Sequence, residues 1–304
     1  MNRAGTFLFL LAVGCSSSTS PAVLATTDGG TDSASDAPVA DVDQVDAYAP
    51  SQPYASDEAL VTIPSARTSD GGPPVELSFD LVSPMAAATP TRIVVLMAGG
   101  NGLLDLTAAG IEQGANNFVV RTRQMYAQAG FAAAVVDTPS DHPQGLDDFR
   151  ATADHATDLG TIVQWLRAKW KGVPVWMIGT SRGTISVADA AARLAGSAAP
   201  DGIVLTSSIT VIPASATDQE SIYSVDFQKI GMPTQIVHNK LDECGASPFS
   251  GAQTLATMFA HTTFFPVDGG AQVSTDKCGA LTYHGYYMLD SQVVPMIVKF
   301  VSSN

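Results

Sequence analysis

The chain has 304 residues, of which 45% are hydrophobic, and this is enough to bury the core of one large α/β domain with an additional segment. Its 29 acidic and 15 basic residues give a formal net charge of −14, which argues against nucleic acid as a partner. The charge is uneven, because residues 16–58 contain eight acids and neither Lys nor Arg.

Residues 1–15 have the character of a signal peptide. Arg3 supplies a positive charge, and the apolar run 6–13 is too short to cross a membrane stably but suits a secretory signal. The ending Ala-Val-Gly-Cys is similar to the lipobox of bacterial lipoproteins, so we expect export and a lipid anchor on Cys15. Ser16 replaces the aspartate that often retains lipoproteins at the inner membrane, which favours the outer membrane. The alternative is an ordinary signal peptide, with a periplasmic or secreted product.

Residues 16–58 are rich in Ser, Thr, Ala, Asp and Pro and hold almost no large apolar side chains. Such a segment cannot bury enough apolar surface to offset the entropy of ordering. We therefore interpret it as a flexible acidic tether, the alternative being a segment that binds a partner. The folded domain is predicted over 59–304.

Apolar runs alternate with helical patterns through this domain. An early strand is expected over 75–82. Buried strands are predicted at 92–97, 131–136, 173–178, 202–207, 233–237 and 262–267, and helices at 117–130, 149–171, 184–195 and 293–301. This order predicts an α/β fold with a mostly parallel sheet and helices on both faces. Ligands of such sheets bind at the carboxyl ends of the strands.

The most informative motif is Gly179-Thr180-Ser181-Arg182-Gly183, which lies between a predicted strand and a predicted helix. A serine on so tight a turn presents its hydroxyl outward, and glycines are needed where no β-carbon fits beside it. The pattern alone is common in plain loops. The strand–turn–helix context favours Ser181 as a nucleophile.

A serine nucleophile needs a histidine base that a carboxylate orients, and both follow the serine in chain order with this motif. His284 lies after the last strand and before the closing helix, where a catalytic base is expected. His238 ends a strand and either lines the site or packs there. Asp242 follows the 233–237 strand and is the predicted acid, with Glu243 as its competitor.

Two cysteines flank the predicted acid and base. Cys244 lies two residues after Asp242, and Cys278 lies six residues before His284. If Cys15 is acylated, these two remain as an even pair for an oxidising compartment. A bridge would stabilise the fold by roughly 3–4 kcal/mol and restrain the Asp–His geometry. The alternative is two unpaired buried thiols.

An oxyanion hole needs two N–H donors. The backbone N–H of Arg182 is the first candidate, and the glycine-rich turn 99–102 supplies the second, from Gly100 or Asn101. The alternative for this turn is a plain glycine-rich connection.

Taken together, these motifs resemble the α/β-hydrolases over about residues 75–302. The chain is most similar to a group of small exported α/β-hydrolases with paired cysteines in the last two loops. In that group Asp-x-Pro-Ser-Asp, here 137–141, follows the fourth strand, and Phe149-Arg150, His155 and Asp158 also match. Unlike lipase-like relatives, the chain lacks a His-Gly dipeptide before the oxyanion glycines. The loop 137–150 is expected either to line or gate the site, or to be a polar connection fixed by Asp–Arg pairs.

The expected function is a monomeric serine hydrolase that cleaves small or surface-exposed carboxylic esters through an acyl-enzyme. Neither a metal nor a cofactor is needed for this chemistry. The alternatives are a peptidase or amidase on the same triad, and a non-catalytic exported binding protein with a hydrolase fold.

Overall fold

The computed structural model describes residues 52–67, 72–84, 88–212 and 220–304. The predicted signal peptide with Cys15, and the predicted tether as far as residue 51, lie outside the described residues.

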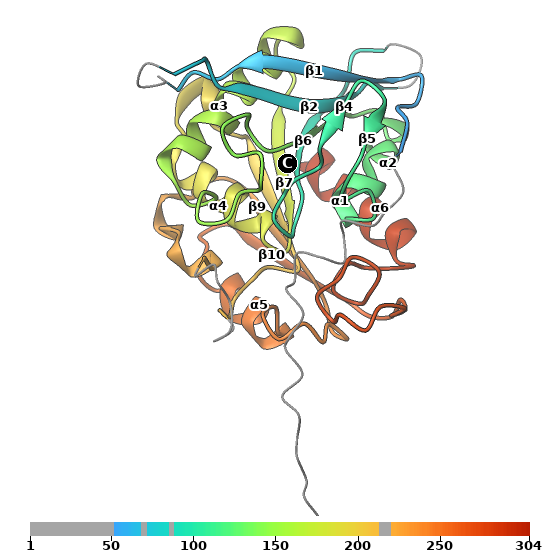
Figure 1. Cartoon of the computed structure of the whole chain (residues 1–304). Coiled ribbons are helices and arrows are strands. Elements are labelled where there is room, and N and C mark those ends of the chain that lie inside the picture. The colour runs from blue at the N-terminus through green and yellow to red at the C-terminus, as the bar shows by residue number, and fades with distance from the viewer. Residues whose placement is uncertain (1–51, 68–71, 85–87, 213–219) are drawn as a thin grey trace, which may run out of the picture. The chain divides into compact units, whose positions relative to one another are not determined.

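An eight-stranded sheet forms the centre of the described domain (Figure 1), in the order β1-β2-β6-β3-β7-β8-β9-β10. The six strands β6, β3, β7, β8, β9 and β10 are parallel to one another, whereas β2 pairs antiparallel with both of its neighbours, β1 and β6. The mostly parallel sheet that the sequence predicts is therefore confirmed. The strands are β1 (Glu58–Pro64), β2 (Glu76–Val82), β3 (Ile93–Met97), β6 (Ala132–Val136), β7 (Val175–Thr180), β8 (Gly202–Thr206), β9 (Thr234–Asn239) and β10 (Thr262–Val267). A second, two-stranded sheet pairs β4 (Leu106–Thr107) with β5 (Gly110–Ile111).

Helices cover both faces of the large sheet (Figure 1). One hydrophobic cluster joins the sheet to α3 (Ala153–Lys169), α4 (Gly183–Arg193) and α5 (Phe249–Ala256). The other cluster joins it to α1 (Phe118–Arg121), α2 (Arg123–Gln128) and α6 (Asp290–Ser303). Short 3-10 helices span Gly196–Ala198, Ile222–Ser224 and Phe227–Lys229. Every residue of β3 and β7 is buried, as strands covered on both faces require.

The structure differs from the sequence-based prediction at several elements. The single helix expected over 117–130 is two helices, separated at Thr122, whose hydroxyl donates 2.6 Å to the carbonyl of Phe118. Such a local side-chain bond competes with the helical pattern of the backbone. β1 and α5 were not predicted.

No helix in the described part of the chain is long and apolar enough to cross a membrane.

Candidate active site

Ser181 occupies a sharp turn between β7 and α4. Its φ is +53°, in the left-handed region that a serine rarely adopts, so the turn holds the backbone of Ser181 in a strained conformation. A Cβ on Gly179 would lie 2.4 Å from the carbonyl oxygen of Gly183. A Cβ on Gly183 would lie 2.2 Å from that of Met97. The prediction that β-carbons do not fit at these glycines is therefore confirmed.

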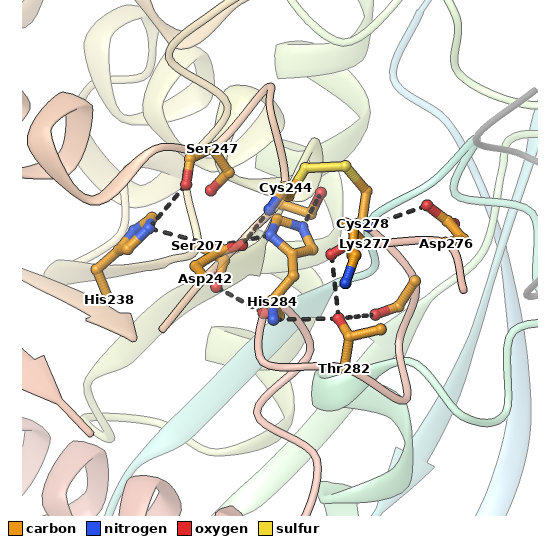
Figure 2. Close-up of a disulfide and its surroundings, with 12 residues drawn as sticks. Ser207, His238, Asp242, Cys244, Ser247, Asp276, Lys277, Cys278, Thr282 and His284 are labelled. Carbon is orange, nitrogen blue, oxygen red and sulfur yellow. Dashed lines mark hydrogen bonds and ion pairs between the residues drawn. A yellow bond between two sulfur atoms is a disulfide. The ribbon is translucent and has the colours of Figure 1, made fainter. Parts of the chain in front are cut away.

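His284 connects Ser181 to Asp242. Its Nε2 lies 2.9 Å from Oγ of Ser181, and its Nδ1 lies 2.9 Å from Oδ2 of Asp242. Figure 2 shows the imidazole beside the Asp242 carboxylate. His284 is 3% exposed, so little water competes for these contacts. The structure thus brings together the three residues that the sequence proposes as nucleophile, base and acid, from three separate loops.

The Asp242 carboxylate is fully buried and receives several donors. Oδ1 accepts a 2.9 Å bond from the N–H of Cys244. Burial alone favours the neutral acid. The interaction with His284, together with the contact from His238, outweighs that cost and holds the pKa of Asp242 well below its usual range. Asp242 is therefore ionised in the folded protein at neutral pH, as a carboxylate that orients an imidazolium must be.

His238 lies behind Asp242 rather than in the cavity at Ser181. Its ring is fully buried, with Nε2 2.9 Å from the carbonyl oxygen of Ser247 and 3.3 Å from Oδ2 of Asp242 (Figure 2). A carbonyl oxygen only accepts, so Nε2 carries the proton and donates toward both oxygens. Of the two positions that the sequence left open, the structure supports the packed one, in contact with the acid. Glu243 instead pairs with Lys277 at the surface.

Cys244 and Cys278 form a disulfide (Figure 2). It joins the loop that follows β9 to the loop that follows β10. Cys278 also lines the cavity beside Ser181, so the bridge reaches the site itself.

The backbone around His284 is fixed by long-range hydrogen bonds. The amide N–H of His284 donates to the hydroxyl of Thr282, and its carbonyl accepts from the hydroxyl of Ser207 at 2.7 Å. The buried Tyr286 hydroxyl donates to the carbonyl of Val237 at 2.7 Å and accepts from the N–H of Ser207 at 3.0 Å. These bonds fasten the histidine loop to the ends of β8 and β9.

Arg121, at the end of α1, also holds this loop. Its guanidinium donates to the carbonyls of Gly285 at 2.7 Å and Ala280 at 3.3 Å, and it pairs with Asp290 at 2.7 Å. Sequence reasoning missed Arg121 and Tyr286, because no local pattern links them to residues that lie far away in the chain.

The cavity at Ser181 has a volume of about 20 Å³. Its lining consists of Gly100, Asn117, Phe118, Thr180, Ser181, Cys278, Ala280, His284 and Gly285. Gly100 is in this lining and Asn101 is not. The Asn101 side chain instead accepts from the N–H of Leu103 and donates to the carbonyl of Gln144. Of the two candidates for the second oxyanion donor, the geometry favours Gly100. Arg182 directly precedes α4, so its backbone lies at the same turn as the nucleophile.

The loop 137–150 is bound to the glycine-rich turn beside this cavity. The buried Arg150 guanidinium donates to the carbonyl of Gly100 at 2.9 Å and to the hydroxyl of Ser186 at 3.0 Å. Asp147 pairs with the Arg182 side chain at 2.8 Å. Within the described residues the loop does not line the cavity at Ser181, which agrees with a polar connection held by Asp–Arg pairing.

Among the described residues, no group of three or more His, Cys, Asp or Glu side chains is arranged to hold a metal ion.

No family model and no curated protein matches the chain. Among solved structures, an α/β serine hydrolase homologue from Coxiella burnetii is similar with a TM-score of 0.53 at 14% identity, covering 83% of this chain and 99% of that one. A serine hydrolase without a lid from Xanthomonas campestris gives 0.51 at 12% identity, covering 81% and 97%. A thermostable carboxyl esterase from Bacillus coagulans gives 0.51 at 13% identity, covering 82% and 99%. At these identities the likeness concerns the fold, and it confirms the α/β-hydrolase fold that the sequence predicts.

Proposed function

We propose that this chain, which has the α/β-hydrolase fold, is a serine hydrolase that cleaves carboxylic esters through an acyl-enzyme. The observation that carries the proposal is the pair of 2.9 Å contacts made by one imidazole, to Oγ of Ser181 and to Oδ2 of Asp242. A serine hydroxyl becomes nucleophilic only when a positioned base takes its proton, and a buried carboxylate holds that base in the useful tautomer.

In the proposed reaction, Oγ of Ser181 attacks the ester carbonyl while its proton moves to Nε2 of His284. The Nδ1–H of the imidazolium faces the ionised Asp242, which stabilises the charge. The backbone N–H groups of Arg182 and Gly100 bind the oxyanion. The carbon–oxygen bond to the leaving alcohol then breaks, and Nε2 returns the proton to the alkoxide. Water then attacks the acyl-enzyme while its proton moves to Nε2 of His284. Nε2 returns the proton to Oγ of Ser181 as the bond between Oγ and the acyl group breaks, which releases the acid and restores Ser181.

The preference for esters rests on two lines of support. One structural neighbour bears the name of a carboxyl esterase and another that of a serine hydrolase without a lid. The cavity at Ser181 is small, which favours short acyl groups or substrates that lie at the surface over long buried chains.

The direct test is labelling and substitution of Ser181. A fluorophosphonate probe should modify Ser181 stoichiometrically, as peptide mapping by mass spectrometry would show. Ser181→Ala should lower kcat for p-nitrophenyl acetate by at least about 10⁴-fold with an unchanged melting temperature. Full activity in this variant, or labelling at another residue, would remove the basis of the proposal.

The same residues could serve an amide leaving group, so the first alternative is a peptidase or amidase. A panel of short-chain esters and matched dipeptide amides distinguishes an esterase from a peptidase or amidase, since each ester has the same acyl group as its matched amide and differs only in the leaving group. Higher kcat/KM on the amides would favour the alternative. A non-catalytic binding protein is excluded if any activated ester gives an acyl-enzyme burst.

We also propose that the protein is exported and anchored by a lipid on Cys15, most readily at the outer membrane, and that it is a monomer. The disulfide supports export, because disulfides persist in oxidising compartments. Metabolic labelling with an alkyne fatty acid should mark the wild-type chain and not Cys15→Ala. Labelling of both chains equally would contradict lipidation at Cys15.

A further inference from the structure

We propose that the side-chain amide of Asn117 is a third oxyanion donor, beside the backbone N–H groups of Arg182 and Gly100. The inference rests on the proposed serine hydrolase function and adds to it a side chain that touches the reacting oxygen.

The first observation is that Asn117 does not perform the usual task of its position. It directly precedes α1, where asparagine normally accepts a hydrogen bond from a backbone N–H of the first helical turn. Here the side chain makes no such bond. The start of α1 instead uses the backbone carbonyl of Asn117, which accepts from Val120 and Arg121.

The second observation is that the carboxamide of Asn117 makes no hydrogen bond among the described residues. Asn117 is 6% exposed, and its Oδ1 is buried without a hydrogen-bond partner in this part of the chain. Buried side-chain polar groups nearly always have a partner, because leaving one unpaired typically costs free energy. The buried Oδ1 fixes the carboxamide in place, and the Nδ2–H groups are the donors that an oxyanion would pair with.

The third observation is where the amide lies. Asn117 lines the cavity at Ser181, together with Gly100 and His284. Nδ2 of Asn117 and Cβ of Ser181 lie 3.4 Å and 2.8 Å from one point, the position that a Cβ on Gly99 would occupy. The lack of a β-carbon at Gly99 therefore allows the Asn117 amide and the Ser181 side chain to lie close to the same point.

The chemistry of the amide suits this place. A carboxamide N–H is a fixed, neutral donor, so it stabilises a developing negative charge without altering the protonation of His284. Because the site is largely closed to water, such a donor acts with little competition from solvent. The substrate's carbonyl oxygen gains its charge only as Ser181 attacks, so the contribution of Asn117 should appear in kcat more than in KM.

The test compares Asn117→Asp with Asn117→Leu at pH 8, using p-nitrophenyl acetate. Aspartate starts a helix as well as asparagine does, but its carboxylate repels an oxyanion. Leucine keeps the volume and removes the donor. We expect both variants to lose about 10²-fold in kcat with KM changed less than threefold, and the Ki of a trifluoromethyl ketone, which binds as a tetrahedral oxyanion, to rise in parallel.

Three outcomes decide the inference. A wild-type kcat in Asn117→Leu overturns it. Retention of kcat in Asn117→Asp, with loss in Asn117→Leu, assigns Asn117 to the start of α1 and also overturns it. Since aspartate preserves the helix start, this variant remains informative if Asn117→Leu does not fold. Fluorophosphonate labelling of Ser181 in the wild type is measured alongside: its absence refutes the hydrolase proposal, whereas normal labelling with unaffected variants refutes only the role of Asn117.

Discussion

The backbone N–H of Cys244 donates a 2.9 Å hydrogen bond to Oδ1 of Asp242. One cysteine of the disulfide therefore lies two residues from the acid and is hydrogen-bonded to it. The other half of the bridge, Cys278, lines the cavity at Ser181. The cross-link therefore restrains the loop that carries the carboxylate and the loop that carries the imidazole at once.

Reduction of the disulfide should cost both stability and activity. The bridge joins residues 34 apart, for which the loss of chain entropy corresponds to about 4 kcal/mol in the free energy of unfolding. We expect dithiothreitol to lower the melting temperature and kcat together, as thermal unfolding and ester hydrolysis would show. The double variant Cys244→Ala/Cys278→Ala is the control, because it should start at the lower values and not respond to the reductant. A wild-type melting temperature in that variant would contradict the prediction.

His238 should affect the basicity of His284 through its contact with Asp242. Its contact helps to keep the pKa of Asp242 low, so its removal leaves the carboxylate more basic and better able to retain the proton of imidazolium His284. We expect His238→Leu to shift the acid limb of the kcat/KM profile toward higher pH by about 0.7 unit at most and to lower kcat about fivefold, as the loss of a hydrogen bond of about 1 kcal/mol implies.

The matched variant is His238→Gln, whose side-chain N–H can occupy the place of the ring Nε2–H. It should recover the wild-type pH profile. If leucine and glutamine shift the profile equally, the contact between His238 and Asp242 has no role in setting it.

A buried carboxylate on β2, toward the opposite end of the sheet from β10, should make stability depend on pH. Asp80 on β2 is fully buried, 3.0 Å from Nε of Arg123, which also contacts Glu58 at 2.7 Å. Burial, together with the negative charge of Glu58, raises the pKa of Asp80 to about 7. The folded state therefore binds a proton more tightly than the unfolded state, whose aspartates titrate near pH 4.

Because the folded pKa is raised, the free energy of unfolding should fall as the pH rises from about 4 to about 7, by at most about 1.4 kcal/mol per unit. Asp80→Asn removes this ionisation, so it should be more stable than wild type above pH 7 and lack this dependence. Urea unfolding at several pH values measures the effect, with the exposed Asp226→Asn as the control. A lower midpoint for Asp80→Asn at pH 8 would contradict the assignment.

The two glycines of the Ser181 turn should not tolerate a methyl group. Gly179→Ala and Gly183→Ala each force a β-carbon against backbone oxygen, which cannot move as a flexible side chain could. We expect losses of about 1–3 kcal/mol or failure to accumulate as soluble protein. Gly231→Ala is the control, since nothing lies within 4 Å of its Cβ position. Equal melting temperatures for the three variants would show that the turn relaxes.

Much of the fold could be predicted because most of its strands and helices follow from local patterns of apolar residues. Buried strands are continuous apolar runs, and the last strand, Thr262–Val267, was predicted with its observed bounds. The elements that were missed carry weaker signals. β1 lies at the edge of the sheet and its buried and exposed residues do not alternate regularly, and α5 contains a glycine, a serine and a threonine, which have low helix propensity.

The site divides in the same way. Ser181, Asp242 and His284 follow from chain order and strand ends. Asn117 and Tyr286 do not, because their importance lies in contacts with distant segments that no spacing reveals. The preference for Gly100 over Asn101 rests on which residue lines the cavity, and the spacing of the turn does not reveal this.

The position of β10 bears on how the protein would lose activity on heating. β10 lies at the end of the large sheet, only one of its six residues is buried, and the loop that carries His284 follows it directly. Ser181 instead extends from β7 in the interior of the sheet. Local opening requires the least free energy where the fewest contacts must break. Opening of β10 and the loop that follows it would therefore separate His284 from Ser181 while the rest of the domain stays folded. The time for which the protein stays active at high temperature is then set by the contacts that hold this one loop, namely the disulfide and the hydrogen bonds of Tyr286 and Arg121, rather than by the packing of the core.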